Sequence, residues 1–128
     1  MAGMTDHTQV PPEATVLRLS GDLDHDSERR LAEAVEAAAA RSTGLLVLDV
    51  AAVTFADSSV LRTLVLTQQR MEAEAGALVL LGPLAPALRR LLEITATDGY
   101  FAVADSLPLA RAAAADLLRR RPQGTGTE

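Results

Sequence analysis

The sequence predicts an α/β fold in a single domain. Short apolar runs typical of buried strands alternate along the chain with longer segments whose apolar residues recur at helical spacing. Strands that alternate with helices are joined by crossover connections, which favour parallel pairing. The 128 residues suit one domain, and 48% of them are hydrophobic, which is enough for a buried core. We therefore expect a mostly parallel sheet packed against helices.

The first half of the chain contains two expected strands and one expected helix. Residues 14–20 alternate partly between apolar and polar side chains, and residues 45–50 form the continuous apolar run of a central strand buried on both faces. Residues 21–26 are expected to form a turn. Residues 27–41 should form a helix whose buried face carries Leu31, Val35, Ala38 and Ala39.

The second half continues the alternation. A helix is expected over residues 58–74, because Leu61, Leu64 and Val65 have helical spacing and Gly76 follows. Further along, we expect a strand, a short helix, a last strand and a final helix at residues 77–81, 85–94, 100–103 and 107–120.

The two ends of the chain differ from this pattern. Residues 1–13 are polar and contain Pro11 and Pro12, so we expect them to be flexible, with room for a short edge strand near residues 8–10. Residues 121–128 are expected to form a flexible tail. The predicted domain therefore spans residues 14–120.

Composition excludes several classes of function. The chain has no cysteine, which excludes disulfides and thiolate metal sites. The net charge of −5, without a basic stripe, argues against nucleic acid as a partner. No apolar run approaches the roughly 20 residues that span a bilayer, and the start lacks the regions of a signal peptide. We therefore expect a cytoplasmic protein that does not bind membranes.

Three small polar residues, Asp57, Ser58 and Ser59, separate an apolar strand from the helix that follows it. Such residues cap helices, because their side-chain oxygens accept hydrogen bonds from the first free backbone N–H groups. If Asp57 is the cap, the serines occupy the first turn and at least one hydroxyl should face solvent. Capping alone is sufficient to explain the motif. This junction and the expected turn over residues 21–26 both follow strands, so we expect the two to lie close together.

Three regions of the chain resemble the STAS family, which includes the anti-sigma factor antagonists of bacteria and the cytoplasmic domains of sulfate transporters. Residues 16–25 resemble its second strand and Gly-Glu/Asp-Leu-Asp turn, residues 55–61 its phosphorylation loop, and residues 78–103 its fourth strand, third helix and last strand. The resemblance covers about residues 14–120. It implies a STAS fold, in which a mixed, mostly parallel sheet of four to five strands packs against about four helices.

The resemblance also implies a function, that of an anti-sigma factor antagonist acting by partner switching. The unmodified protein would bind an anti-sigma factor that is also a serine kinase and so free a sigma factor. The kinase would then phosphorylate Ser58 and end the complex, and a serine phosphatase would reset the protein. The family's partner-facing surface corresponds here to Asp22, Asp24, His25, Phe55, Asp57, Ser59 and Arg62.

One residue departs from the family pattern. The family commonly has glycine directly after the two serines, whereas this chain has Val60. A β-branched side chain is tolerable in the first helical turn, but it is expected to add bulk where a partner backbone approaches. The difference therefore bears on the choice of partner and on phosphorylation.

Two other functions are open to the same motif. A STAS module could bind or scaffold without being phosphorylated, in a stress-signalling or lipid-transport assembly. An enzyme using Ser58 as a nucleophile would need a base and oxyanion donors, but only His7 and His25 are available as bases and no Gly-x-Ser-x-Gly elbow is present. We therefore do not expect an enzyme, and the sequence leaves dimerisation open.

The acidic residues after the first strand suggest a metal site only in part. Asp22, Asp24 and Asp26 have the spacing of a calcium-binding loop. However, Ser27 stands where that loop needs glycine, and the residues that follow it are helical in pattern. We expect turn and helix-start residues here, and no metal or cofactor.

Overall fold

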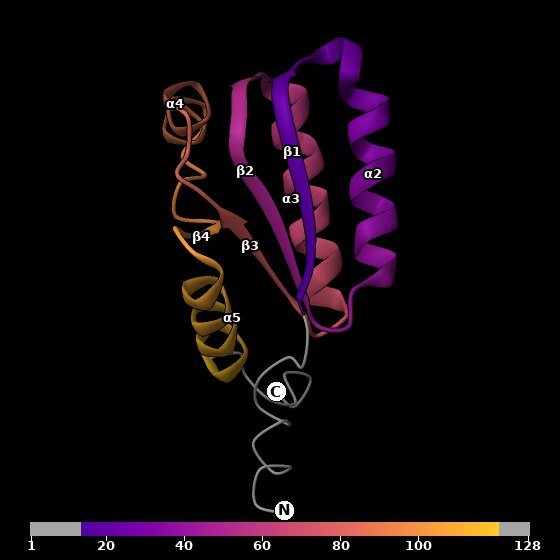
Figure 1. The fold of residues 1–128 in the computed structure, drawn as a ribbon, viewed down its shortest axis with the longest axis vertical. Helices are drawn as coiled ribbons and strands as arrows, with labels where there is room; N and C mark the ends of the chain where they lie inside the picture. The colour runs from indigo at the N-terminus through magenta and orange to yellow at the C-terminus, as the bar shows by residue number, and fades with distance from the viewer. Residues whose placement is uncertain (1–13, 121–128) are drawn as a thin grey trace, which may run out of the picture.

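The computed structural model describes residues 14–120. Within them, four strands and four α-helices alternate, with one 3-10 turn (Figure 1). In chain order the elements are β1 (Ala14–Leu23), η1 (His25–Ser27), α2 (Glu28–Arg41), β2 (Leu45–Ala56), α3 (Ser58–Ala73), β3 (Ala77–Leu81), α4 (Pro86–Ile94), β4 (Ala102–Ala104) and α5 (Leu107–Arg120). The expected flexible ends and the edge strand near residues 8–10 lie outside the described residues.

The four strands form one sheet in the order β1-β2-β3-β4. All three pairings between these described strands are parallel, so the predicted α/β class is confirmed. The pairing of β1 with β2 starts at Ala14 and Leu45, and that of β2 with β3 at Leu45 and Ala77. In parallel strands the carboxyl ends meet at one edge of the sheet, and the segments that follow β1 and β2 therefore meet there as well.

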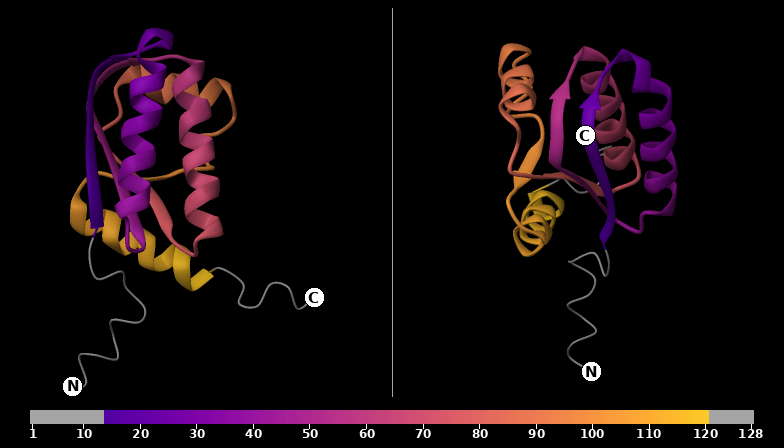
Figure 2. Two further views of the ribbon diagram at one scale, coloured as in Figure 1. Left: turned by 90° about the vertical axis from the view of Figure 1, so that its right-hand side faces the viewer. Right: turned by 45° about the horizontal axis from the view of Figure 1, so that its top comes forward.

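Apolar clusters lie on both faces of the sheet. α2 and α3 run side by side on one face, and α5 lies on the other (Figure 2). The helix face predicted for residues 27–41 is buried as expected. The larger cluster joins α2, α3 and α4 to the sheet and includes Leu31, Val35, Leu46, Leu48, Leu64, Leu78, Leu80, Leu88 and Leu92. The smaller cluster lies under α5 and includes Leu45, Val47, Val79, Ala110 and Ala114.

β1 and β2 are longer than the sequence predicted. The expected turn over residues 21–26 was wrong for residues 21–23, which belong to β1, and β2 continues six residues beyond the predicted end at Val50. The register between these strands shifts twice, between Arg18 and Ser20 and between Gly21 and Asp22. At each shift β2 has an extra residue, as in a β-bulge. The shifts leave pairs of adjacent exposed residues in β2. These pairs interrupt the alternation of buried and exposed side chains, so the sequence alone does not show where the strand ends.

The last strand is displaced from its predicted position at residues 100–103. It begins at Ala102 and ends at Ala104. The backbone of Tyr100 instead belongs to a turn, since its N–H donates to the Thr97 carbonyl oxygen at 3.0 Å. The side chain of Phe101 is buried in the larger cluster. The apolar character of these two residues therefore reflects packing beside the strand rather than pairing within it.

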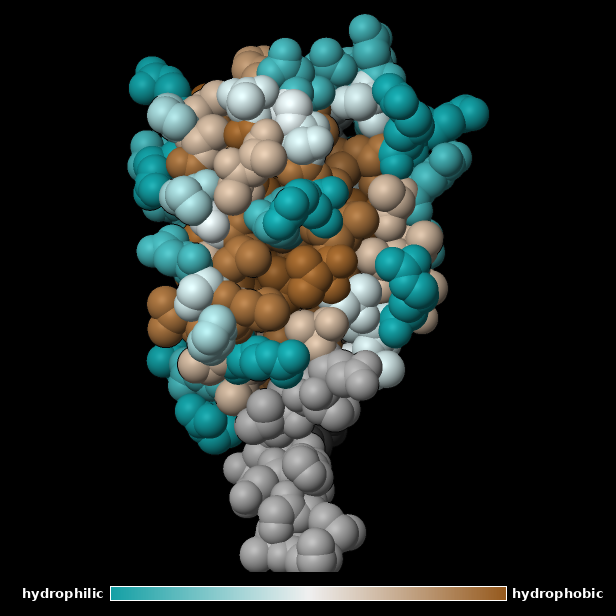
Figure 3. Space-filling view, in the orientation of Figure 1, coloured by the Kyte–Doolittle hydropathy of each residue, from teal (hydrophilic) through white to brown (hydrophobic). Residues whose placement is uncertain are grey.

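The face of the sheet that carries α5 is only partly covered. The space-filling view in Figure 3 shows hydrophobic surface gathered in the middle of the molecule. Val16, which is 45% exposed, belongs to β1, and Arg18 Nε lies 3.3 Å from the Asp49 carboxylate on β2.

Among residues 14–120, no helix has the length and apolar composition needed to cross a membrane.

Candidate functional site

The junction between β2 and α3 has the predicted cap geometry. Asp57 has an extended backbone, and its carboxylate accepts from the Ser59 backbone N–H at 3.0 Å. The helix then begins at Ser58, which is exposed. The expectation of a capped helix with a solvent-facing serine is confirmed.

The two serines of the junction differ in their hydrogen bonding. The Ser59 hydroxyl donates to Asp57 Oδ1 at 2.6 Å, and Ser59 is half-buried. The Ser58 hydroxyl has no hydrogen-bond partner among the described residues. Only one of the two hydroxyls is therefore both exposed and uncommitted.

The Asp57 carboxylate is held in its ionised form. The hydroxyl of Ser59 is the main cause of its lowered pKa. Burial acts in the opposite direction, and the backbone N–H groups of Ser59, His25 and Val60 lower the pKa further. Hydrogen bonds that favour the charged form of a carboxyl group lower its pKa. At neutral pH the junction therefore carries a fixed negative charge beside Ser58.

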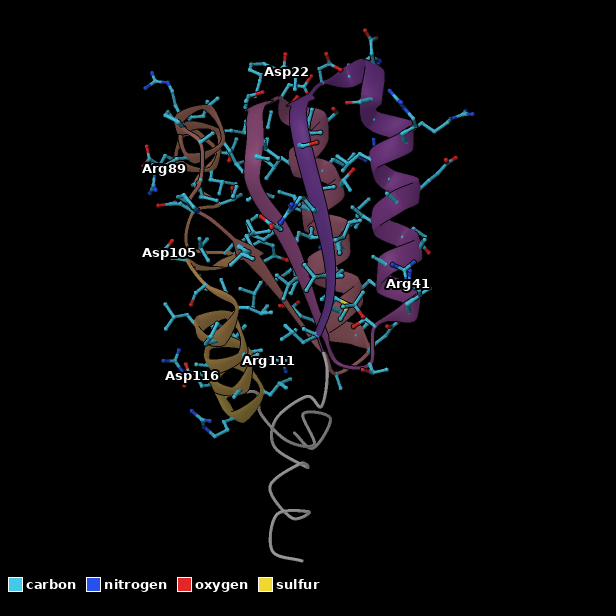
Figure 4. The ribbon with its side chains drawn as sticks, viewed as in Figure 1. Asp22, Arg41, Arg89, Asp105, Arg111 and Asp116 are labelled. Carbon is cyan, nitrogen blue, oxygen red and sulfur yellow. The ribbon has the colours of Figure 1, made fainter. Side chains whose placement is uncertain are left out.

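The turn after β1 contacts this junction directly. The Asp57 N–H donates to the Leu23 carbonyl oxygen at 3.2 Å, and Asp22 pairs with Phe55 in the sheet. The hydroxyl of Thr54 donates to Asp22 Oδ1 at 2.6 Å, across 32 positions of sequence. The predicted proximity of Asp22 and the Asp57-Ser58 junction is confirmed. Asp22 lies at the end of the molecule where β1 and β2 finish (Figure 4).

Asp24 and His25 form the turn itself. The Asp24 carboxylate accepts from the Ser27 N–H at 3.2 Å, and the Asp24 N–H donates to Ser27 Oγ at 3.0 Å. The His25 ring is exposed, with Nδ1 3.3 Å from Glu28 Oε1. Asp24 therefore holds the shape of the turn, while His25 faces solvent. Within residues 14–120 no group of histidine and carboxylate side chains could hold a metal ion.

The remaining predicted residues flank the junction. Phe55 precedes it in β2 and is 46% exposed, which is high for an aromatic side chain. Arg62 lies one turn into α3 and is exposed. The structure thus places Phe55, Ser58 and Arg62 along the exposed part of one continuous stretch, beside the turn after β1.

Val60 corrects one expectation. Its side chain is 2% exposed and belongs to the larger apolar cluster. The expectation that it adds bulk at the partner-facing surface was wrong, because the third position of α3 points inward. The valine fills core space instead.

Sequence reasoning also missed Thr54. It is exposed, and its hydroxyl is the group that binds the Asp22 carboxylate. Its role depends on the register shift that places it near Asp22, so only the pairing of the strands, and no local motif, could have revealed it.

The chemistry open to Ser58 depends on which groups contact its hydroxyl. A serine nucleophile requires a base that takes its proton, and no described residue forms a hydrogen bond with the Ser58 hydroxyl. A partner could approach this hydroxyl from solvent, because Ser58 is exposed and begins a helix.

The chain is similar to known proteins over most of its length. A family model described as "Mlab, STAS domain" matches residues 7–108. No curated protein sequence matches the chain significantly. Among solved structures, an anti-sigma factor antagonist from Mycobacterium paratuberculosis is 32% identical, with a TM-score of 0.67, and the alignment covers 80% of this chain and 86% of that one.

Two more distant structures share the fold. The Bacillus cell fate determinant SpoIIAA in its phosphorylated form is 22% identical, with a TM-score of 0.58 and coverage of 79% of this chain and 91% of that one. A sulfate transporter family protein from Wolinella succinogenes is 20% identical, with a TM-score of 0.65 and coverage of 88% and 92%.

Proposed function

The chain belongs to the STAS domain family, and from this premise we propose that it is an anti-sigma factor antagonist switched off by phosphorylation at Ser58. The observation that carries the proposal is the Ser58 hydroxyl, exposed at the start of α3 and without a hydrogen-bond partner among the described residues. The similarity to a solved anti-sigma factor antagonist supports the general role.

The proposed partner is an anti-sigma factor that is also an ATP-dependent serine kinase, acting in the cytoplasm. The γ-phosphoryl group of ATP passes to Ser58 Oγ: a new O–P bond forms, the bond from the γ-phosphorus to ADP breaks, and a base on the kinase takes the hydroxyl proton. A serine phosphatase reverses the modification by hydrolysis.

Phosphorylation would weaken binding without unfolding the domain. The phosphate adds about −1.5 to −2 charges, which the positive end of the α3 dipole tolerates. In an interface the same group lies beside the ionised Asp57, and taking the charges of the phosphate out of water there costs a few kcal/mol. We therefore expect affinity for the anti-sigma factor to fall ~100-fold or more.

The seven residues of the proposed partner-facing surface divide into two kinds. Asp24, Asp57 and Ser59 are half-buried and hydrogen-bonded within the site, so we assign them to holding its shape. The exposed residues are assigned to direct contact, and they are Asp22, His25, Phe55 and Arg62.

The test is phosphorylation by candidate anti-sigma kinases. The protein is incubated with ATP and each kinase, and the peptide carrying Ser58 and Ser59 is sequenced by mass spectrometry. Ser58→Ala should abolish the modification, while the matched control Ser59→Ala should retain it. Phosphate found on Ser59, or none from any kinase that binds the protein, would contradict the proposal.

The second candidate is a STAS module that binds a partner without being phosphorylated. It is favoured by the family model's description and by the shared fold of a sulfate transporter protein. Partner affinity unchanged by Ser58→Asp would support this candidate. Hydrolysis of an ester by the isolated protein would instead indicate an enzyme.

A further inference from the structure

Three exposed side chains lie in a row along α3, the first two polar and the third apolar. Ser58, Arg62 and Leu66 follow one another at intervals of one helical turn, and all three are exposed. The opposite face is buried and includes Val60 and Leu64. Because residues four apart on a helix are neighbours, the Arg62 side chain lies next to Ser58 on the solvent side of the helix.

The Arg62 guanidinium is uncommitted. Arg18 and Arg70 form ion pairs with carboxylates, whereas the Arg62 side chain has no ion pair or hydrogen bond with a residue in the described part of the chain. No acidic residue occupies the first turn of α3, and Glu72 is the only acid in the helix. Nothing on this helix within one turn of Arg62 competes for its charge.

Resting on the proposed phosphorylation, we propose that Arg62 is the side chain that pairs with the phosphate on Ser58. An anion at position i and a cation at i+4 is the favourable order of charges along a helix. A guanidinium also matches a phosphate group geometrically, through two parallel N–H···O bonds. Phosphorylation then acts twice, because it adds a dianion and withdraws Arg62 from contact with the partner.

Arg29 is an alternative cation on the neighbouring helix. It lies in the first turn of α2, one turn before Ala32, and Ala32 lines the groove between α2 and α3. Arg29 therefore lies on the side of α2 that faces α3. The helical spacing favours Arg62, since it shares an element with Ser58, and the experiment includes both residues.

The test uses full-length protein with phosphoserine incorporated at position 58 during translation, so no kinase is required. Phosphorus NMR follows the titration of the phosphate in the unsubstituted protein and in Arg62→Gln, Arg62→Lys and Arg29→Gln. A paired guanidinium stabilises the dianion, so Arg62→Gln should raise the second pKa of the phosphate by about 0.15–0.4. Arg90→Gln, on exposed α4 surface, is the control and should leave it unchanged.

The outcomes are separable. A raised pKa in Arg62→Gln, with a smaller change in Arg62→Lys, supports the pairing. Equal titration of the unsubstituted protein and Arg62→Gln overturns it, as does an effect confined to Arg29→Gln. Circular dichroism verifies that the variants fold. If no kinase modifies Ser58 while the NMR shift is present, the proposed switch fails and the pairing stands.

Discussion

The Asp57 carboxylate connects two parts of the chain that sequence alone shows as separate motifs. It caps α3 through the Ser59 N–H and accepts from the Ser59 hydroxyl, while the His25 N–H contributes to its lowered pKa. The same residue's N–H bonds to the Leu23 carbonyl oxygen. One side chain and its backbone therefore hold the helix start against the turn after β1.

Replacing Asp57 should cost stability in a pH-dependent way. Asp57→Ala removes a helix cap, and we expect a loss of about 1 kcal/mol at pH 7 in urea unfolding. Because the folded pKa of Asp57 lies below its ordinary 3.8, the contribution is complete above that pH and is lost as the pH falls through the folded value. The difference in the free energy of unfolding between the unsubstituted protein and Asp57→Ala should therefore become smaller below pH 3.8.

The control for this measurement is Asp26→Ala, at an exposed acid in the same turn. It should leave the free energy of unfolding nearly unchanged. A pH-independent loss in Asp57→Ala would show that the carboxylate charge is not what stabilises the junction.

Val60 should matter for stability rather than for partner binding. Its side chain is 2% exposed within the larger cluster, so Val60→Gly, the residue common in the family, leaves a cavity and adds backbone freedom. We expect a loss of about 2 kcal/mol or more in urea unfolding. Val60→Ala should account for part of it, and a Val60→Gly protein as stable as the unsubstituted one would contradict the assignment.

At the scale of elements, the helices were easier to predict than the strand ends. α3 begins at Ser58 as the cap motif predicts, and it ends one residue before the predicted Glu74. The two long strands run further than predicted, because bulges in β2 place exposed residues side by side. Helical periodicity and caps are local signals, whereas a bulge depends on the partner strand.

The two faces of α3 offer a matched test of its packing. Leu64 is 1% exposed and Leu66 is 55% exposed, two positions apart in one helix. Leu64→Ala should lower the free energy of unfolding by about 2–5 kcal/mol, while Leu66→Ala should change it by less than about 0.5 kcal/mol. Chemical denaturation measures both. Similar losses in the two variants would mean that α3 is rotated from the orientation described.

At the scale of the molecule, α5 is the helix that packs on the second face of the sheet. The family model matches only as far as residue 108, but Ala110 and Ala114 of α5 bury Leu45 and Val47. α5 lies across the lower part of the sheet on the face opposite α2 and α3 (Figure 2). The helix is therefore part of the folding unit.

Truncation tests this role. A chain ending at Ser106 exposes the smaller apolar cluster, and we expect loss of cooperative thermal unfolding and aggregation, since large exposed apolar patches promote association. A chain ending at Arg120 keeps α5 and is the control. Cooperative unfolding of the shorter chain, at an unchanged midpoint, would show that α5 is dispensable.

Topology explains how much of the site could be predicted. Alternating strands and helices implied parallel pairing, and parallel pairing implied that Asp22 and Asp57 lie at one edge; both predictions were confirmed. The inward direction of Val60 and the hydrogen bond from Thr54 to Asp22 were not predicted. They depend on helix rotation and strand register, which follow from packing across the whole domain.

The hydrogen bond between the Asp57 N–H and the Leu23 carbonyl oxygen also bears on how fast a partner can bind. A surface fixed by backbone contacts before the encounter has little conformational entropy left to lose on association. Complex formation should then proceed as the docking of two preformed shapes, with its rate set by diffusion and orientation and not by the folding of a loop.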